Sequence, residues 1–169
     1  MLIHWPAIAG HPPSSDIHQS IRLGTWRALE RHVREGTLAH IGVSNYTLAH
    51  LTQLAANCTI KPAVLQVEIH PWFIPQAEID WCKANNVVVE AYSSLGEGKR
   101  LGVARAQVLL AWARMHGWVV LPKARSEERM RINLKSVRVD LTSDEVEALD
   151  RVARGKNHKF CWDPSKWRK

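Results

Sequence analysis

The chain has 169 residues, of which 46% are hydrophobic and 23% charged, as in an ordinary soluble globular protein with one core. No stretch approaches the roughly 20 consecutive apolar residues that a membrane-spanning helix needs, so we expect no membrane partner. The net charge of +7 favours an anionic partner without identifying it. The densest basic stretch, residues 123–138, is interrupted by Glu127 and Glu128 and lacks stacking aromatics, so we expect no nucleic-acid partner.

Cysteine and histidine spacing bears on the compartment and on metal binding. The three cysteines, Cys58, Cys82 and Cys161, form no CxxC motif and are too few for a disulfide framework. We expect them to be reduced, which favours a cytoplasmic protein. The nine histidines show no metal-ligand spacing, so no metal is expected. Residues 1–169 are expected to form a single domain.

Apolar runs of strand length alternate with segments of helical period along the chain. The runs are nearly continuous, as is typical of parallel strands covered on both faces. The predicted strands are Leu2–Trp5, Leu38–Val43, Val64–Glu68, Val87–Ala91 and Trp118–Leu121. The predicted helices are Ile21–Glu35, Leu48–Ala56, Ala77–Ala84 and Val103–His116, followed by two terminal helices.

Helix faces and ends follow from the same pattern. The helix at 21–35 is expected to bury Trp26, Leu29 and Val33 and to end at Gly36. The helix at 48–56, behind Thr47 as N-cap, is expected to bury Leu48, Leu51 and Leu54. Near the end of the chain, Thr142-Ser143-Asp144-Glu145 forms a capping box that predicts the last helix.

The alternation of strands and helices indicates an α/β fold. An open doubly wound sheet and a piece of a (β/α)8 barrel both fit the spacing of the strands. The first strand is not followed by a GxGxxG motif, which weakens the doubly wound alternative.

Several segments, in order and at the spacing of whole elements, resemble the aldo-keto reductase family. They are Leu2-Ile3-His4-Trp5-Pro6, Gly42-Val43-Ser44-Asn45-Tyr46, Gln66-Val67-Glu68-Ile69-His70-Pro71, Ala91-Tyr92-Ser93-Ser94-Leu95-Gly96, and Pro122-Lys123 with Glu128-Arg129 and Asn133. The helix segment Trp26-Arg27-Ala28-Leu29-Glu30 is similar as well. The resemblance covers nearly the whole chain. It implies strands four to eight of the barrel, that is, a partial TIM (β/α)8 barrel of five parallel strands with outer helices.

The resemblance also implies NADP(H) as cofactor and a small-molecule carbonyl as substrate. Each motif lies at the C-terminal end of a predicted strand, where such barrels place their active sites. The residues implied in cofactor binding are Ser44, Asn45 and Gln66 for the nicotinamide amide, Tyr92 for the nicotinamide ring, Lys123, Ser126 and Arg129 for the 2′-phosphate, and also Ser93, Leu95 and Asn133. His4 is implied in catalysis and Trp5 in lining the substrate pocket.

Taken one by one, these residues also have structural interpretations. Asn45 alone fits a loop or cap residue, Gln66 a satisfied core amide, and Tyr92 a core tyrosine. The basic stretch alone fits a solvated helix face. The chain also departs from the family pattern at Ala124, Arg125 and Ile132, and in the direct run of residues 96–102 into the next helix, where the family has a longer excursion.

The family's catalytic group consists of an Asp, a Tyr, a Lys and a His, of which His4 alone has a counterpart here. The chain has two tyrosines, Tyr46 and Tyr92, and other motifs place both. The remaining three catalytic residues would precede Met1, so we expect a truncated chain without activity of its own. The alternatives are a non-catalytic nucleotide-binding remnant and a subunit that associates through open barrel edges. A nucleic-acid-binding protein would rest on charge alone.

Overall fold

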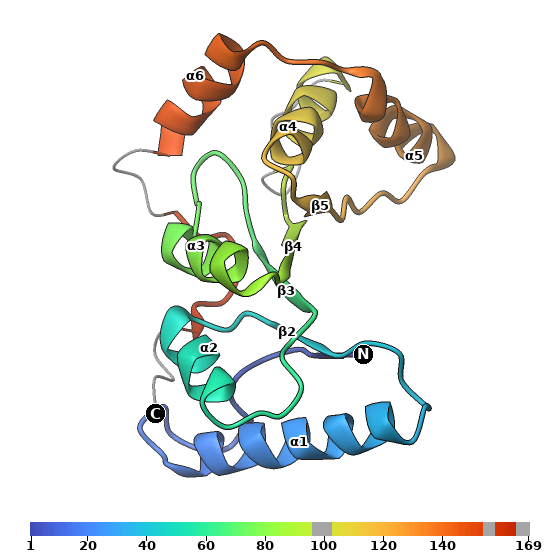
Figure 1. The fold of residues 1–169 in the computed structure, drawn as a ribbon. Helices are drawn as coiled ribbons and strands as arrows, with labels where there is room; N and C mark the ends of the chain where they lie inside the picture. Colours follow the sequence, from blue (N-terminus) through green and yellow to red (C-terminus); the bar gives the residue numbers. More distant parts are fainter. Residues whose placement is uncertain (96–102, 154–157, 165–169) are drawn as a thin grey trace. The chain divides into compact units, whose positions relative to one another are not determined.

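The computed structural model describes residues 1–95, 103–153 and 158–164, and these form two compact units. The first unit consists of Met1–Val67, Gln76–Val89 and Asp163–Lys169, and the second of Glu68–Pro75 and Glu90–Trp162. The expected short run at 96–102 lies outside the described residues. Figure 1 shows how the chain runs through the strands and helices of both units.

The five strands are parallel and are hydrogen-bonded in sequence order, β1-β2-β3-β4-β5. They are β1 (Leu2–Ile3), β2 (Gly42–Ser44), β3 (Val64–Glu68), β4 (Val88–Tyr92) and β5 (Val119–Val120). A doubly wound sheet reverses its strand order midway, and this sheet does not. The sequential order is that of consecutive strands in a (β/α)8 barrel, so the fold class expected from the sequence is confirmed.

Strand β2 is shorter than predicted and begins later in the chain. The backbone N–H groups of Thr37 and Leu38 both donate to the carbonyl of His32, 3.0 and 3.2 Å away, at the end of the preceding helix. These bonds occupy the backbone that a strand from Leu38 would use, so the prediction of Leu38–Val43 was wrong at its start. Pairing begins at Gly42, whose N–H donates to the Met1 carbonyl at 3.0 Å.

Gly42 lies where neighbouring strands come closest. A Cβ at this position would lie 2.6 Å from the Val64 carbonyl oxygen and 2.7 Å from the side chain of Leu2. Because a backbone oxygen cannot move aside as a flexible side chain can, the close pairing of β2 requires glycine here.

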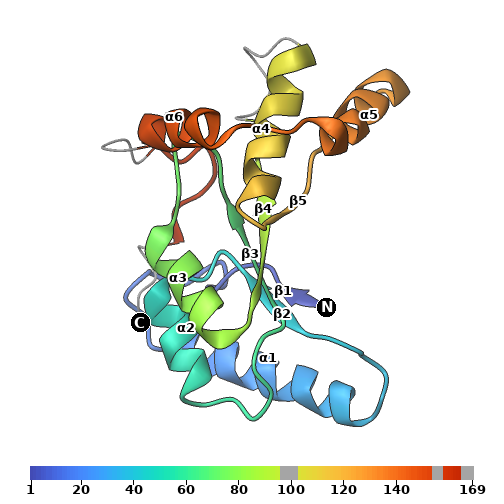
Figure 2. The same cartoon turned by 45° about the horizontal axis from the view of Figure 1, so that its top comes forward.

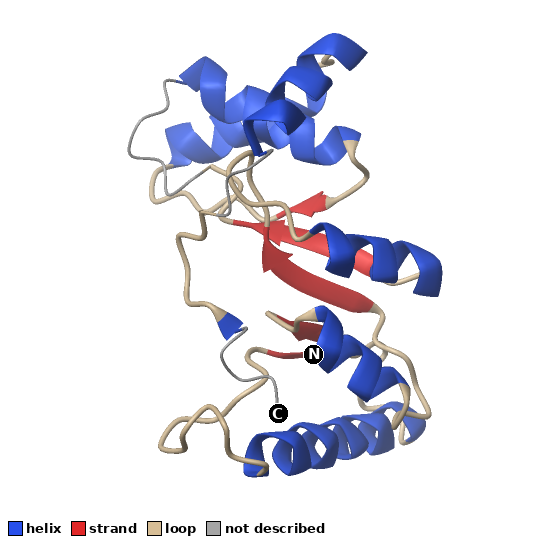
Figure 3. Cartoon of the chain, turned by 90° about the vertical axis from the view of Figure 1, so that its left-hand side faces the viewer, coloured by secondary structure: helices blue, strands red, loops and turns tan. Residues whose placement is uncertain are grey.

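Three helices accompany the strands of the first unit: α1 (Ile17–Arg34), α2 (Leu48–Ala55) and α3 (Gln76–Asn85). Helices α2 and α3 contact each other and lie on the same side of β2 and β3 (Figures 2 and 3). Helix α2 begins after the predicted cap Thr47, and His50 rather than an acidic residue completes the capping box. Leu51 and Leu54 are buried as predicted, whereas Leu48 is 39% exposed, so its predicted burial was wrong.

Helix α1 buries a largely polar face. Its buried residues are His18, Arg22, Trp26 and Glu30, which are spaced four apart. Leu29 and Val33, predicted to share the buried face with Trp26, are only half-buried. The polar members are satisfied locally: Arg22 donates to the Pro6 carbonyl at 2.8 Å and to the Gln53 amide oxygen at 2.8 Å.

The second unit contains α4 (Val103–Met115), α5 (Glu127–Leu134), a 3₁₀ turn η2 (Lys135–Arg138) and α6 (Ser143–Ala153). Helix α4 contacts α5, η2 and α6. The predicted capping box at the start of α6 is confirmed, since the Thr142 N–H donates to Glu145 at 2.8 Å and the Glu145 N–H to the Thr142 hydroxyl at 3.3 Å. Trp112 of α4 donates to the Asp150 carboxylate of α6 at 2.7 Å.

Candidate cofactor and active site

Polar groups that follow β1, end β2 and belong to the backbone of β3 form one hydrogen-bonded cluster in the first unit. The Asn45 side-chain amide donates to the His4 carbonyl at 2.9 Å and to the Ser44 hydroxyl at 3.1 Å. The Ser44 hydroxyl and the Asn45 backbone N–H both donate to the Gln66 carbonyl, each at 2.9 Å. The predicted site residues Ser44 and Asn45, at the C-terminal end of β2, are therefore brought together with the backbones of His4, after β1, and of Gln66, in the middle of β3.

Backbone conformation fixes where Asn45 presents its amide. Asn45 has a φ of 61°, a left-handed conformation that asparagine tolerates better than most residues. Ser44 and Asn45 are buried, whereas Gln66 is half-buried. The cluster thus combines the fixed Asn45 amide and the Ser44 hydroxyl with the Gln66 backbone carbonyl. Amide and hydroxyl groups are of the kind that recognise a carboxamide. The same hydrogen bonds also join neighbouring strands, so these residues contribute to the stability of the sheet as well.

His4 and Trp5 follow β1 directly. His4 is exposed, and its ring stacks on Trp5 with centroids 5.5 Å apart and an interplanar angle of 23°. An exposed imidazole beside an indole can offer a hydrogen bond to a polar group that lies against the apolar ring.

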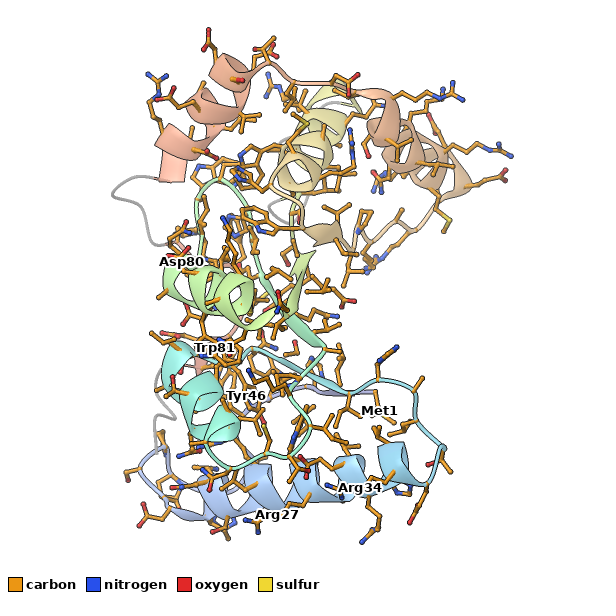
Figure 4. The ribbon with its side chains drawn as sticks, viewed as in Figure 1. Met1, Arg27, Arg34, Tyr46, Asp80 and Trp81 are labelled. Atoms are coloured by element: carbon orange, nitrogen blue, oxygen red, sulfur yellow. The ribbon has the colours of Figure 1, made fainter. Side chains whose placement is uncertain are left out.

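Tyr46, the next residue after Asn45, is enclosed in the core of the first unit. It is 2% exposed, and among the described residues its hydroxyl has no hydrogen-bond partner (Figure 4). Burial raises the pKa of Tyr46, although the charge of Arg22 acts against the rise. A hydroxyl in this position is a poor proton donor because ionisation is disfavoured.

In the second unit, Tyr92 is the last residue of β4 and Ser93 follows it. Both are half-buried, and Ser93 has a φ of 53°. The Ser93 hydroxyl lies 3.6 Å from the Cys161 thiol. Tyr92 has a hydrogen bond with the same thiol, and its pKa is raised by burial first and then by Cys161 and Glu68. Leu95 is half-buried and ends the described part of this segment.

A buried carboxylate near Tyr92 was not predicted. Glu68 is fully buried and accepts hydrogen bonds from the His70 ring at 3.0 Å, the Phe160 N–H at 2.6 Å and the Cys161 N–H at 3.2 Å. The Lys159 ammonium lies 3.8 Å away. Burial alone would raise the pKa of Glu68, but the hydrogen bonds and Lys159 outweigh burial and lower it. The signal in the sequence was a charged residue inside an apolar strand run.

The predicted phosphate-binding residues follow β5 in the second unit. Lys123 and Arg129 are exposed, and Ser126 is the N-cap of α5, where its hydroxyl accepts from the Arg129 N–H at 3.4 Å. In the part of the chain that the structure describes, no ion pair joins Lys123 or Arg129 to a carboxylate, whereas Arg131 contacts Glu127 at 2.6 Å. Two uncompensated cations beside a helix N-terminus suit an anion.

Asn133 and Ala124 lie near this basic loop in sequence. Asn133 is 9% exposed on α5. The neighbouring Ile132 carbonyl accepts a hydrogen bond from Gln107 of α4 at 3.1 Å, which anchors the end of α5. Ala124 is half-buried, and Arg125 is exposed. No contact of Arg125 in the structure explains its departure from the family pattern.

The described residues also bear on membrane crossing and on metal binding. In residues 1–95, 103–153 and 158–164, no helix combines the length and apolar character that crossing a membrane requires. Over the same ranges, no three His, Cys, Asp or Glu side chains are grouped as metal ligands. The described cysteines, Cys58, Cys82 and Cys161, are free thiols.

Comparison with known proteins places the chain in a family. Residues 1–102 match the model of the aldo/keto reductase family. The chain is 35% identical to glycerol 2-dehydrogenase (NADP(+)) of Hypocrea jecorina, matching 94% of this chain and 60% of that protein. It is 34% identical to glyoxal reductase of Bacillus subtilis, matching 88% of this chain and 54% of that protein.

Solved structures agree with the sequence comparisons. Aldose reductase from Giardia lamblia superimposes with a TM-score of 0.78 at 28% identity, covering 99% of this chain and 66% of that one. A mutant of Gox0644 in complex with NADPH gives a TM-score of 0.83 at 28% identity, covering 96% of this chain and 61% of that one. The chain thus spans a little over half to two thirds of these proteins. By sequence and by fold, it belongs to the aldo/keto reductase family.

Proposed function

We propose that this chain supplies the cofactor-binding part of an NADP(H)-dependent oxidoreductase that reduces aldehydes or ketones to alcohols. The observation that carries the proposal is the cluster of Ser44 and Asn45, at the end of β2, with the backbone carbonyl of Gln66 on the adjacent parallel strand β3. Relatives point the same way: glycerol 2-dehydrogenase is described as acting with NADP(+), and a Gox0644 structure contains NADPH.

Each predicted cofactor residue has chemistry that fits its assigned role. Ser44, Asn45 and Gln66 would hold the nicotinamide carboxamide, and the Tyr92 ring would stack on the nicotinamide. Lys123 and Arg129 would neutralise the 2′-phosphate, with Ser126 adding a hydroxyl at the helix N-terminus. Ser93, Leu95 and Asn133 complete the proposed cofactor-binding set. Bound NADPH would supply the hydride for carbonyl reduction.

The proton is the other half of the reaction, and neither of the two tyrosines is placed as a suited donor. A carbonyl that accepts hydride also needs a proton from a well-placed general acid. Tyr46 is enclosed in the core, and Tyr92 is assigned to the cofactor; the pKa of each is raised. The exposed His4 would orient the substrate carbonyl beside Trp5. We therefore propose that this chain binds the cofactor but does not turn over by itself.

A rate measurement tests this proposal. We expect NADPH to quench the fluorescence of the 169-residue chain until binding is saturated. When an aromatic aldehyde is then added, we expect NADPH to be oxidised no faster than in buffer alone. The missing general acid alone is typically worth about 10²–10⁴-fold in rate. Turnover at the roughly 1–10³ per second of ordinary enzymes would contradict the proposed inactivity.

The second candidate is a non-catalytic subunit that associates through exposed apolar surface. In the second unit, Met130, Leu134 and Val137 are 55%, 69% and 55% exposed along α5 and η2. Val119 of β5, at one end of the strand order, is 45% exposed. Exposed apolar residues along a helix and an exposed strand at the end of a sheet each favour association. A chain that sediments as a dimer and does not bind NADPH would favour this candidate over the enzyme.

A further inference from the structure

The segment 158–161 is clamped onto the segment 68–73 within the second unit. The His158 N–H donates to the Trp72 carbonyl at 3.1 Å, and the Lys159 ammonium lies 4.6 Å from the centre of the Phe73 ring. The Phe160 ring packs against His70, with ring centroids 4.7 Å apart. These contacts come from three successive residues, so the segment is held along its length although it forms no regular secondary structure.

Glu68 is the centre of this clamp. Its carboxylate is fully buried and accepts the backbone N–H groups of Phe160 and Cys161, 92 and 93 residues further along the chain. His70 and Lys159 provide the remaining hydrogen bond and opposite charge. A buried charge is tolerated only when hydrogen bonds and opposite charge compensate it, so the carboxylate fixes where these partners must lie.

The clamped segment ends at the proposed cofactor residues. The Cys161 thiol lies 3.6 Å from the Ser93 hydroxyl and has a hydrogen bond with Tyr92. A displacement of Cys161 would therefore change the surroundings of the Tyr92 ring directly.

We propose that Glu68 is a positioning residue: it holds Phe160 and Cys161 in place, and Cys161 in turn sets the position of Tyr92 for the nicotinamide ring. The effect on the ring rests on the proposed function. The anchoring of residues 158–161 by Glu68 does not rest on the proposed function, and the alkylation rate of Cys161 measures it separately.

The test uses Glu68→Gln, which keeps the size of the side chain and removes its charge. Site-resolved alkylation by iodoacetamide, read by peptide mass spectrometry, reports how often Cys161 becomes accessible. Hydrogen bonds to a charged acceptor are the strong ones, so we expect Cys161 to react about tenfold faster in the variant. Cys82 serves as an internal reference, because burial first and Glu78 second raise its pKa to about 12.

Glu30→Gln is the matched control. Glu30 is another buried carboxylate that accepts two backbone N–H groups, those of Thr59 and Ile60, but it belongs to the first unit. We expect Glu30→Gln to leave the Cys161 rate unchanged in folded protein. If Glu68→Gln does not fold, Lys159→Met removes the ion-pair partner of Glu68 together with its contact to the Phe73 ring, and is expected to raise the rate about twofold to threefold.

NADPH titration supplies the second readout. We expect Glu68→Gln to weaken NADPH binding about threefold to tenfold, and Glu30→Gln to leave it unchanged. An unchanged Cys161 rate in folded Glu68→Gln would overturn the anchoring. A raised rate with unchanged NADPH affinity would overturn the positioning of Tyr92. A wild-type chain that does not bind NADPH would refute the proposed function, while the alkylation rates still decide whether Glu68 anchors the segment.

Discussion

Replacing Trp112 by Ala is expected to lower the free energy of unfolding of the second unit by about 3–5 kcal/mol. Trp112 is fully buried on α4, and its ring lies 5.4 Å from that of Trp118. Its indole N–H donates to Asp150, which also lies 2.9 Å from the His116 ring. The substitution therefore leaves a large cavity and removes one of the bonds that join α4 to α6. Urea denaturation followed by far-ultraviolet circular dichroism measures the loss.

Two further variants divide the effect of Trp112. Trp112→Phe keeps a six-membered aromatic ring but removes the N–H donor and part of the buried volume, and we expect a loss of about 1–3 kcal/mol. Met115→Ala lies on the same helix but is 47% exposed, so it should change stability by less than about 1 kcal/mol. If Trp112→Ala costs no more than Met115→Ala, the packing of α4 described here is wrong.

Replacing Glu30 by Ala is expected to cost about 2–4 kcal/mol in the first unit. Glu30 accepts the Thr59 N–H at 2.6 Å and the Ile60 N–H at 2.8 Å, and Arg34, labelled in Figure 4, lies 3.7 Å away. Without the carboxylate, two backbone donors in the loop before β3 lose their acceptor. Glu35→Ala, at the exposed end of the same helix, is the control and should cost less than about 1 kcal/mol.

The contribution of Glu30 should also depend on pH. Burial alone would raise its pKa, but the hydrogen bonds from Ile60 and Thr59 and the charge of Arg34 lower it below the ordinary value of 4.5. A carboxylate whose pKa is lower in the folded than in the unfolded state stabilises the fold at pH values above its unfolded-state pKa. This stabilisation is lost as the pH falls through the folded-state pKa. The stability difference between the wild type and Glu30→Gln should therefore shrink below about pH 4. A difference that grows on acidification would contradict the assigned interactions.

The strands and helices that depend on local pattern could be predicted from the sequence. Val64–Glu68 forms β3 at the predicted residues, because a short apolar run between helical segments is typical of a buried strand. The start of β2 could not be predicted, because the bonds of Thr37 and Leu38 to His32 extend the end of α1 at the expense of a strand. Spacing alone fitted two topologies, and it was the resemblance to the family that predicted the sequential strand order that the structure shows.

Most of the features that could not be predicted from the sequence involve buried polar groups. The α1 face of His18, Arg22 and Glu30 resembles a solvated surface until its partners in distant loops are known. The site shows the same contrast. Ser44 and Asn45 follow a strand directly and could be placed at its end. The approach of Cys161 to Ser93 joins residues 68 positions apart through a segment without periodicity, and no local signal encodes it.

Cofactor discrimination tests the central claim most directly. Fluorescence titration with NADPH and NADH compares two ligands that differ in the 2′-phosphate, which Lys123 and Arg129 are proposed to bind. We expect at least about a tenfold preference for NADPH, since charge-assisted bonds to phosphate are worth about 1.5–3 kcal/mol. Lys123→Ala and Arg129→Ala should each reduce the preference, whereas Arg131→Ala should not, because Arg131 is already paired with Glu127. Equal affinity of the wild-type chain for the two nucleotides would contradict the account.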